Sequence, residues 1–124
     1  MPRIESANST TLRLKRAELS MRRSLGPVLD AEHVTFEHWQ VLAALLEHPG
    51  IRMTDLAEAA VLPAATLTRH VDRLVERALI IRRVDPADRR RAVVALSARG
   101  EHLATRLHEL ESRVAVSADV LSVR

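Results

Sequence analysis

The sequence predicts a mainly α-helical domain that carries one small β-hairpin. Apolar residues recur at helical spacing along most of the chain, whereas only two short runs are rich in β-branched residues. Three glycines and no tyrosine do not suit a sheet-rich fold. The 124 residues, 47% of them hydrophobic, are enough for a single domain with a sizeable core.

The composition also excludes several classes of function. The absence of cysteine excludes disulfides, thiolate metal sites, cysteine nucleophiles and thiol-based redox switches. The longest apolar run, residues 41–46, is far shorter than the about 20 residues of a transmembrane helix, and the N-terminus lacks a signal-peptide pattern. The sequence contains no glycine-rich phosphate loop, nucleophile elbow or catalytic carboxylate pair. We therefore expect a cytoplasmic protein that is not an enzyme, needs no cofactor and has no membrane partner.

The first thirty residues are predicted to form one helix with apolar stripes on two sides. One stripe consists of Leu14, Met21, Leu25 and Val28. Leu12 and Leu19, one heptad apart, form the second stripe. Candidate N-cap residues lie at positions 8–11, and Gly26-Pro27 is expected to kink or end the helix. We expect one stripe to pack on the chain's own domain and the other on a partner chain, with packing in the core alone as the alternative.

A helix-turn-helix is predicted next. Thr35 is the expected N-cap of a helix that ends at Pro49. A short helix spans about residues 54–60, and Pro63 is expected to begin a third helix that runs to about Ala78. Two helices joined by so short a turn are typical of a helix-turn-helix. The third helix is predicted to bury Leu67, Val71, Leu74 and Ala78. Its opposite face is predicted to present Thr66, Arg69, His70, Arg73 and Arg77.

The remaining sequence predicts a hairpin and a last helix. Residues 80–84 and 92–96 are the β-branched-rich runs, and a charged loop that contains Pro86 joins them. Ser97 is the expected N-cap of the last helix, which fades after about Val116. The apolar positions of this helix are Leu103, Leu107, Leu110 and Val114.

The positive charge is concentrated in one segment. Between Arg69 and Arg91 there are eight arginines and four acidic residues, a local charge of +4, although the whole chain carries only +3. The chain has 18 arginines and one lysine, and the planar guanidinium suits phosphate. Such a block is the expected footprint of a surface that binds a polyanion, most often nucleic acid, although a solvated charged face would have the same composition.

A helix, a helix-turn-helix and a β-hairpin in this order predict a winged helix. Three stretches carry a more specific pattern: residues 39–45 (WQVLAAL), residues 65–74 (ATLTRHVDRL) and the hairpin with the helix start after it. In the last stretch the matching residues are Asp88, Arg90, Leu96, Ser97 and Gly100. The three stretches resemble the second helix, the recognition helix and the wing of the MarR family of bacterial transcription regulators. The wing match is the most specific, with Ser97 in the place of a threonine.

The chain departs from the pattern of this family at three places. Pro63 stands where the family often has a Ser or Thr cap before the recognition helix. Ala78 stands where a glycine commonly ends that helix, so the turn must avoid a positive φ or accept a small strain. Only 24 residues follow Gly100, enough for about one helix, whereas the family usually adds two that intertwine with the first helix to form the dimer.

The resemblance implies a homodimeric transcriptional regulator, a repressor that binds a pseudo-palindromic operator in double-stranded DNA and responds to a small aromatic or acidic effector. Residues 1–34 and 98–124 would supply the dimerisation helices around a DNA-binding winged helix at residues 35–97, all within one compact domain. The residues expected at the dimer interface are Leu14, Met21, Leu25, Leu103, Leu107 and Leu110.

Groove dimensions and the resemblance together select the DNA-contacting residues. The N-terminal part of a recognition helix reaches base edges in the major groove. The candidates there are Ala65, Thr66, Thr68, Arg69 and Arg73. The family pattern assigns Arg90 to the adjacent minor groove and Asp88 to holding the loop. Arg89 and Arg91 are expected to contact phosphates, as is Arg83 at the strand end.

Two alternatives stay open at the level of sequence. A winged helix can serve as a protein-interaction module, which needs no charge on its recognition face. A metal-responsive regulator of the same family would use Glu37 and His38 with others of the six histidines. No two histidines have the i, i+4 spacing of a helical zinc site, and the sequence therefore assigns no metal ligand. The arginines of the third helix and of the hairpin loop favour DNA.

Overall fold

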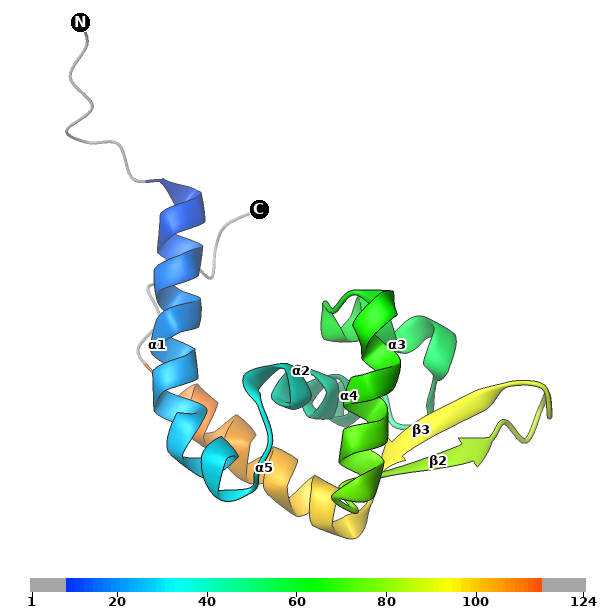
Figure 1. Ribbon diagram of the computed structural model, residues 1–124. Helices are drawn as coiled ribbons and strands as arrows, with labels where there is room; N and C mark the ends of the chain where they lie inside the picture. The colour runs from blue at the N-terminus through cyan, green and yellow to red at the C-terminus, as the bar shows by residue number, and fades with distance from the viewer. Residues whose placement is uncertain (1–8, 115–124) are drawn as a thin grey trace, which may run out of the picture.

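Figure 1 shows the computed structural model of the chain, which describes residues 9–114 and confirms the predicted fold class. The described part contains five helices and a three-stranded sheet. The elements are α1 (Thr10–Ala31), α2 (Phe36–Glu47), β1 (Ile51–Arg52), α3 (Met53–Ala60), α4 (Ala64–Glu76), β2 (Ile80–Val84), β3 (Ala92–Leu96) and α5 (Ala98–Ser112). None of the described helices is both long and apolar enough to span a membrane.

Polar side chains begin three of these helices, as predicted. The Ser9 hydroxyl accepts a hydrogen bond from the N–H of Leu12 at 3.2 Å. Thr35 caps α2, and Ser97 caps α5 by accepting from the N–H of Gly100 at 2.9 Å. A side-chain oxygen at this position satisfies one of the N–H groups that a helix start leaves unpaired, and it stabilises the helix by about 1 kcal/mol.

Gly26-Pro27, which was expected to kink or end the first helix, does not end it, because α1 continues to Ala31. Proline deprives the carbonyl of Arg23 of its donor, but Pro27 and Arg23 are both exposed, so water can replace that donor. Helix α5 ends at Ser112, and Val114 is therefore not part of it. Residue 116, where the sequence predicted this end, lies outside the described residues.

The predicted hairpin of β2 and β3 is confirmed, and a third strand joins it. Strand β3 pairs antiparallel with β2 along its whole length. On the other edge of β3, Ile51 of β1 lies opposite Val94 and Arg52 lies opposite Val93. A two-residue strand carries no periodic signal, so the sequence did not predict it. The strand order β1-β3-β2 ties the hairpin to the segment that leads into α3.

Helix α2 is the centre of the fold, because it contacts the four other helices and β3. Figure 1 shows α1 on one side of α2, α3 and α4 on the other, and α5 running beneath α2. The buried hydrophobic residues of α2 are Trp39, Val41, Leu42, Ala44 and Leu45. Helix α4 packs against them through Leu67, Val71 and Leu74, as predicted.

Three residues that the sequence placed at a dimer interface lie in the core of the single chain. Leu25, Leu103 and Leu107 are at most 3% exposed, because α1 packs against both α2 and α5. The prediction that these three residues form the dimer interface is therefore wrong. Met21 and Leu110 are partly buried at the edge of the core. Leu14, also placed at the interface, is exposed, as are Leu12 and Leu19, and all three lie in the half of α1 that Figure 1 shows extending beyond the other helices.

Three helices end with a non-glycine residue in the left-handed region. His33 follows α1, Val61 follows α3 and Ala78 follows α4, each with φ between 57° and 58°. After α4, the N–H groups of Ala78 and Leu79 donate to carbonyls of the last helical turn, both at 2.9 Å. Glycine usually occupies the left-handed position of this motif. Of the two outcomes expected at Ala78, a turn without positive φ or a small strain, the structure therefore shows the strain. The predicted burial of Ala78 is wrong, because it lies beyond α4 and is exposed, and Leu79 is buried instead.

The turn after α4 is joined to the start of α5 by Ser97 and Gly100. The Ser97 hydroxyl donates to the carbonyl of Ala78 at 2.7 Å, and the Ser97 N–H donates to the carbonyl of Leu79 at 3.0 Å. Gly100 is buried in the first turn of α5, so near to Leu79 that a Cβ on Gly100 would overlap the Leu79 carbonyl. The Leu-Ser-x-x-Gly pattern is therefore a packing requirement, because it allows α5 to lie directly on the turn between α4 and β2.

The close approach of Gly100 to Leu79 predicts that the one extra methyl group of alanine at position 100 greatly lowers the stability of the protein. Gly100→Ala should lower the free energy of unfolding by about 1–3 kcal/mol, because backbone must move to admit the Cβ. Gly26→Ala is the matched control, since a Cβ there meets nothing within 4 Å. Alanine in place of a glycine inside a helix should stabilise the protein by about 0.5–1 kcal/mol. Urea denaturation measures both changes, and equal effects of the two substitutions would contradict the packing argument.

Candidate nucleic-acid interface

The exposed face of α4 carries the residues that the sequence assigned to the major groove. Ala65, Thr68, Arg69 and Arg73 are exposed, and Thr66 is half-buried. Pro63 is the N-cap residue and makes no side-chain cap bond. The Thr66 hydroxyl donates to the Pro63 carbonyl at 3.1 Å. The first N–H groups of α4 are therefore not bonded by a capping side chain, and such groups are well suited to phosphate.

The arginines of α4 and β2 differ in how firmly they are held. Arg69 has no ion-pair partner within residues 9–114. Arg73 lies 3.6 Å from the carboxylate of Glu76, a loose pair on the surface. Arg82 forms an ion pair with Asp72 at 2.8 Å and so joins β2 to α4. Helix α4 thus presents two guanidiniums that can reach a ligand, whereas the guanidinium of Arg82 braces the wing.

Asp88 holds the arginines of the wing tip, which we define as residues 85–91. Its carboxylate accepts from the N–H of Arg90 at 3.0 Å and from the Arg90 Nε at 3.2 Å. It also lies 3.4 Å from the Nε of Arg91. The bond from the Arg90 N–H, and then the bond from its guanidinium, hold the pKa of Asp88 below its usual range. The Arg90 side chain is nevertheless 90% exposed, so it is oriented at its base and open to a ligand.

Arg52 and Asp85 are site residues that the sequence did not identify. Asp85 is only 7% exposed, and its carboxylate accepts from the N–H of Ala87 at 2.8 Å. The same carboxylate lies 3.3 Å from the Nε of Arg52. Arg52 belongs to β1, which carries no sequence signal, and therefore nothing in the sequence connects the two residues.

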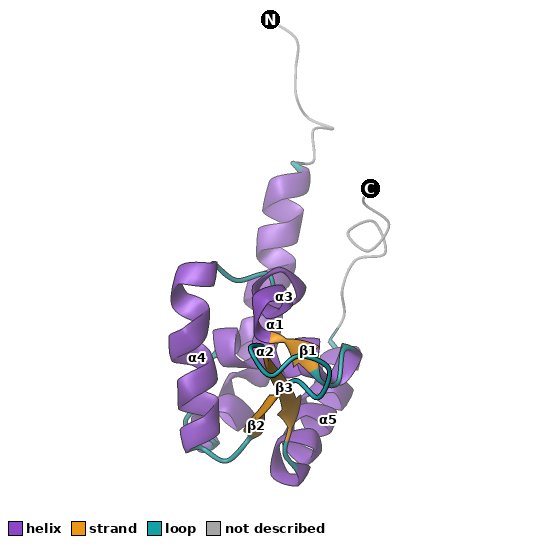
Figure 2. Cartoon of the chain, turned by 90° about the vertical axis from the view of Figure 1, so that its right-hand side faces the viewer, coloured by secondary structure: helices purple, strands orange, loops and turns teal. Residues whose placement is uncertain are grey.

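The structure brings the predicted residues of α4 and of the wing to neighbouring parts of one surface. Figure 2 looks toward the wing tip, with α4 standing beside the hairpin. The exposed cationic side chains of the two parts are Arg69, Arg73, Arg82, Arg83, Arg89, Arg90 and Arg91. An exposed helix beside a projecting charged loop matches the geometry in which a winged helix contacts a major groove and the adjacent minor groove.

The start of α2 holds a buried histidine that packs on α4. The Nδ1 of His38 accepts from the N–H of Thr35 at 2.9 Å, and the N–H of His38 donates to the Thr35 hydroxyl at 3.2 Å. Histidine thus completes a reciprocal capping box that usually employs Glu or Gln. The His38 ring also packs edge-to-face on the ring of His70 from α4, with centroids 5.1 Å apart.

The neighbouring Glu37 is also engaged within the chain. Its carboxylate pairs with Arg22 of α1 at 2.7 Å, and the bond from Arg22 holds the pKa of Glu37 below its ordinary value. Both residues that the metal-responsive alternative would use therefore serve the packing of α2 against its neighbours. Within residues 9–114, no three side chains of metal-binding type form a group that could hold an ion.

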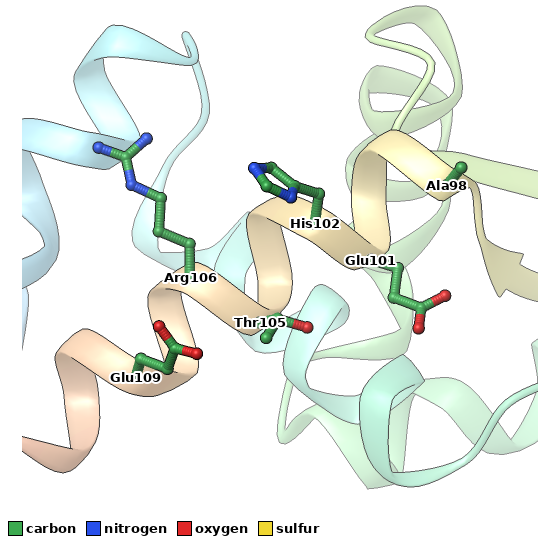
Figure 3. A pocket seen from close by; sticks show the side chains of 6 residues that line it. All are labelled: Ala98, Glu101, His102, Thr105, Arg106 and Glu109. Atoms are coloured by element: carbon green, nitrogen blue, oxygen red, sulfur yellow. The ribbon is translucent and has the colours of Figure 1, made fainter.

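Two hollows lie along α5. Figure 3 shows the larger, with a volume of about 600 Å³. It is lined by Ala98, Glu101, His102, Thr105, Arg106 and Glu109. All six occupy one face of one helix, so this is an open surface and not an enclosed site. The second hollow, of about 350 Å³, lies between α2 and α5, and Trp39 is the aromatic residue in its lining.

Comparison of the sequence with known proteins identifies regulators. Residues 34–91 match a model described as MarR family. The transcriptional regulator HosA of Escherichia coli O111:H- is 41% identical over 70 residues, which are 56% of this chain and 52% of HosA. The chain therefore matches about half the length of that relative. The HTH-type transcriptional regulator FarR of Neisseria gonorrhoeae is 26% identical over 122 residues, which are 98% of this chain and 84% of FarR.

Comparison of the fold identifies solved structures of the same kind. NadR in complex with 4-hydroxyphenylacetate superposes with a TM-score of 0.74 and 27% identity, over 90% of this chain and 79% of NadR. The MepR–DNA complex from S. aureus superposes with a TM-score of 0.67 and 25% identity, over 84% of each chain. Both similarities extend beyond the winged helix to the helices that flank it.

The buried His38 predicts a pH-dependent stability. Burial lowers its pKa from the ordinary value of 6.5, and repulsion from His70 and Arg73 lowers it further, against the opposing effect of Glu37. Between the two pKa values the unfolded chain binds more protons than the folded chain. The contribution of His38 is therefore fully present above pH 6.5 and is lost as the pH falls through its lower folded value.

His38→Gln tests this dependence, because the glutamine amide can accept from the Thr35 N–H without titrating. The variant should lose less stability than the parent protein between pH 7 and pH 5, as measured by thermal unfolding at each pH. His102→Gln is the matched control, since His102 is exposed and should leave the pH profile unchanged. Identical profiles for the parent and His38→Gln would refute the role given to His38.

Proposed function

We propose that the chain is a member of the MarR family, a cytoplasmic transcriptional repressor that binds a pseudo-palindromic DNA operator as a homodimer and responds to a small-molecule effector. HosA and FarR are transcriptional regulators, and the MepR neighbour is a DNA complex. The observation that carries the proposal is the placement of the exposed arginine face of α4 beside a wing tip whose Arg90 is held by Asp88.

In this proposal α4 lies in the major groove. Arg69 is free to form a forked pair with a guanine, and the uncapped N–H groups at the start of α4 are free to bind a phosphate. The wing tip reaches the adjacent minor groove, where Arg90 is attracted by the negative potential of a narrow A·T-rich segment. Arg89 and Arg91 bind the phosphates on either side, and Arg83 does so nearer the strand.

The second copy of the chain covers the exposed half of α1. Leu12, Leu14 and Leu19 are between 45% and 49% exposed in the single chain, and a partner helix would remove them from water. Met21 and Leu110 lie at the edge of the core and extend the apolar surface toward α5. Two copies related by a two-fold axis present two α4 helices, which suits a pseudo-palindromic site.

The effector is placed in the hollow between α2 and α5. This hollow is lined by α5, one of the two proposed dimerisation helices, and by α2, on which α4 packs, so a molecule bound there can alter the spacing of the two α4 helices. Trp39 supplies an aromatic contact for a ring. The NadR neighbour holds 4-hydroxyphenylacetate, an aromatic acid, which supports an effector of this chemical class.

Arg90→Ala should weaken binding to the operator by about 1–3 kcal/mol per protomer and reduce the preference for A·T-rich flanks, because the minor-groove contact is lost. The operator is taken from a selection of duplexes out of a random pool, and affinity is measured by gel shift at two salt concentrations. Arg106→Ala on α5 removes the same charge away from the wing and is the control. Equal affinities of the parent and Arg90→Ala would disprove the wing contact.

Arg89→Ala should instead change the salt dependence. If about six phosphates are neutralised per dimer, the plot of log affinity against log salt has a slope near −5. Loss of one phosphate contact in each protomer should reduce the magnitude of this slope by about 2, with little change in sequence preference. An unchanged slope would show that Arg89 does not contact phosphate.

Leu14→Glu should dissociate the dimer, because a carboxylate would be buried in the apolar contact between two copies of α1. Sedimentation equilibrium at micromolar concentration should give a dimer mass for the parent and a monomer mass for the variant. Lys15→Glu is the control, since it introduces the same carboxylate at a neighbouring exposed polar position. A monomeric parent protein would contradict the two-half-site model.

A further inference from the structure

Within residues 9–114, one ion pair links the wing tip to a residue outside the hairpin. Among the hydrogen bonds and ion pairs of residues 9–114, those of the wing tip stay within the hairpin, except the ion pair between Asp85 and Arg52. Strand β1 pairs with β3 only as far as Val93, so the backbone ladder to β1 ends before the loop. The part of the hairpin that would enter the minor groove therefore depends on this ion pair for its position.

Asp85 organises the loop as well as binding Arg52. Its N–H donates to the carbonyl of Arg91 at 2.8 Å, which closes the base of the loop. Its carbonyl accepts from the N–H of Asp88 at 3.2 Å, and Asp88 in turn orients Arg90. A continuous chain of bonds thus leads from Arg52 through Asp85 and Asp88 to the guanidinium of Arg90.

Arg52 is itself held by the helix-turn-helix. It is both the last residue of β1 and the N-cap residue of α3, and its backbone lies opposite Val93 in the sheet. The Asp85 side chain is 9% exposed and the Arg52 side chain 42%, so the pair is only partly screened by water. Arg52 also helps to hold the pKa of Asp88 below its usual range, which places its charge within reach of both aspartates.

We propose that Arg52 is a positioning residue for DNA binding, which sets the place of the wing tip relative to α4 through Asp85 and so determines the contact of Arg90 with the minor groove. This inference rests on the function proposed above. Without Arg52, the Asp85 carboxylate loses its cation and the loop is free to turn about the end of the sheet. Arg90 then meets the groove in many orientations and its contact is weakened.

Direct contact of Arg52 with a phosphate is the competing explanation. Arg83 lies opposite Val93 on the other side of β3, so Arg52 and Arg83 occupy one cross-strand row. Both line a hollow of about 430 Å³ on this face of the sheet. Arg83 has no ion-pair partner within the described residues, whereas Arg52 is bound to Asp85. Arg83 is therefore the matched comparison for a residue that contacts phosphate directly.

A double-mutant cycle in the full chain separates these roles. Arg52→Met should weaken binding to the selected operator about tenfold and reduce the preference for A·T-rich over G·C-rich flanks, a preference that loss of a phosphate contact alone would leave unchanged. In the Arg90→Ala background, Arg52→Met should have little further effect, because the contact that it positions is already gone. Arg83→Met should instead reduce the salt slope, and its effect should add to that of Arg90→Ala.

The results that overturn the proposal are equally defined. Independent effects of Arg52→Met and Arg90→Ala, or an unchanged preference for A·T-rich flanks in Arg52→Met, would make Arg52 a phosphate contact. Unchanged affinity of Arg52→Met, with Arg90→Ala impaired, would refute the positioning role but leave the proposed function intact. Failure of the parent protein to bind any duplex from the selection would refute the proposed function itself.

A measurement without DNA tests the positioning role directly. Backbone ¹⁵N relaxation should show lower order parameters for residues 86–91 in Arg52→Met than in the parent protein, with the rest of the chain unchanged. Arg52→Lys keeps a cation opposite Asp85, so its order parameters and its operator affinity should lie between those of Arg52→Met and the parent protein. If Arg52→Met does not fold, Arg52→Lys takes its place in the comparison with the parent protein. Equal order parameters in all three proteins would overturn the proposal.

Discussion

The first turn of α5 rests on the carbonyl of Leu79 with no side chain between them, and the arrangement of the winged helix depends on this contact. Gly100 permits the close approach, and Ser97 bonds to the carbonyls of both Ala78 and Leu79. The turn at this point leads from α4 into β2, and Ser97 leads from β3 into α5. One contact therefore relates α4, the wing and α5 to one another.

Backbone strain accompanies this compact arrangement. His33, Val61 and Ala78 each adopt the left-handed conformation that glycine tolerates best, and each ends a helix where the chain must turn sharply. Such a conformation costs a non-glycine residue on the order of 1 kcal/mol. The packing of Leu79 and Val34, which follow two of these residues and are at most 5% exposed, provides the compensating burial.

Local chemistry explains which features could be predicted from the sequence. Thr35 and Ser97 predict the starts of their helices, because a hydroxyl cap bonds to a backbone N–H only three residues away. The buried and exposed faces of α4 follow from the spacing of its apolar residues alone. The burial of Leu25 and Leu103 could not be separated from a dimer contact, because periodicity identifies an apolar stripe without saying what covers it. The Arg52–Asp85 pair joins residues far apart in the chain through a two-residue strand, and no local pattern predicts such a contact.

All of the positive charge of the candidate interface comes from arginine side chains, which limits the modifications that can change this charge. The single lysine of the chain, Lys15, is exposed on α1, and neither α4 nor the wing contains one. Lysine acetylation therefore cannot neutralise a side chain of this surface, and arginine methylation would leave its charge in place. Because guanidinium stays protonated throughout the physiological pH range, the charge offered to a polyanion is constant. Neither a change of pH in that range nor these two modifications can therefore remove the positive charge of these arginines.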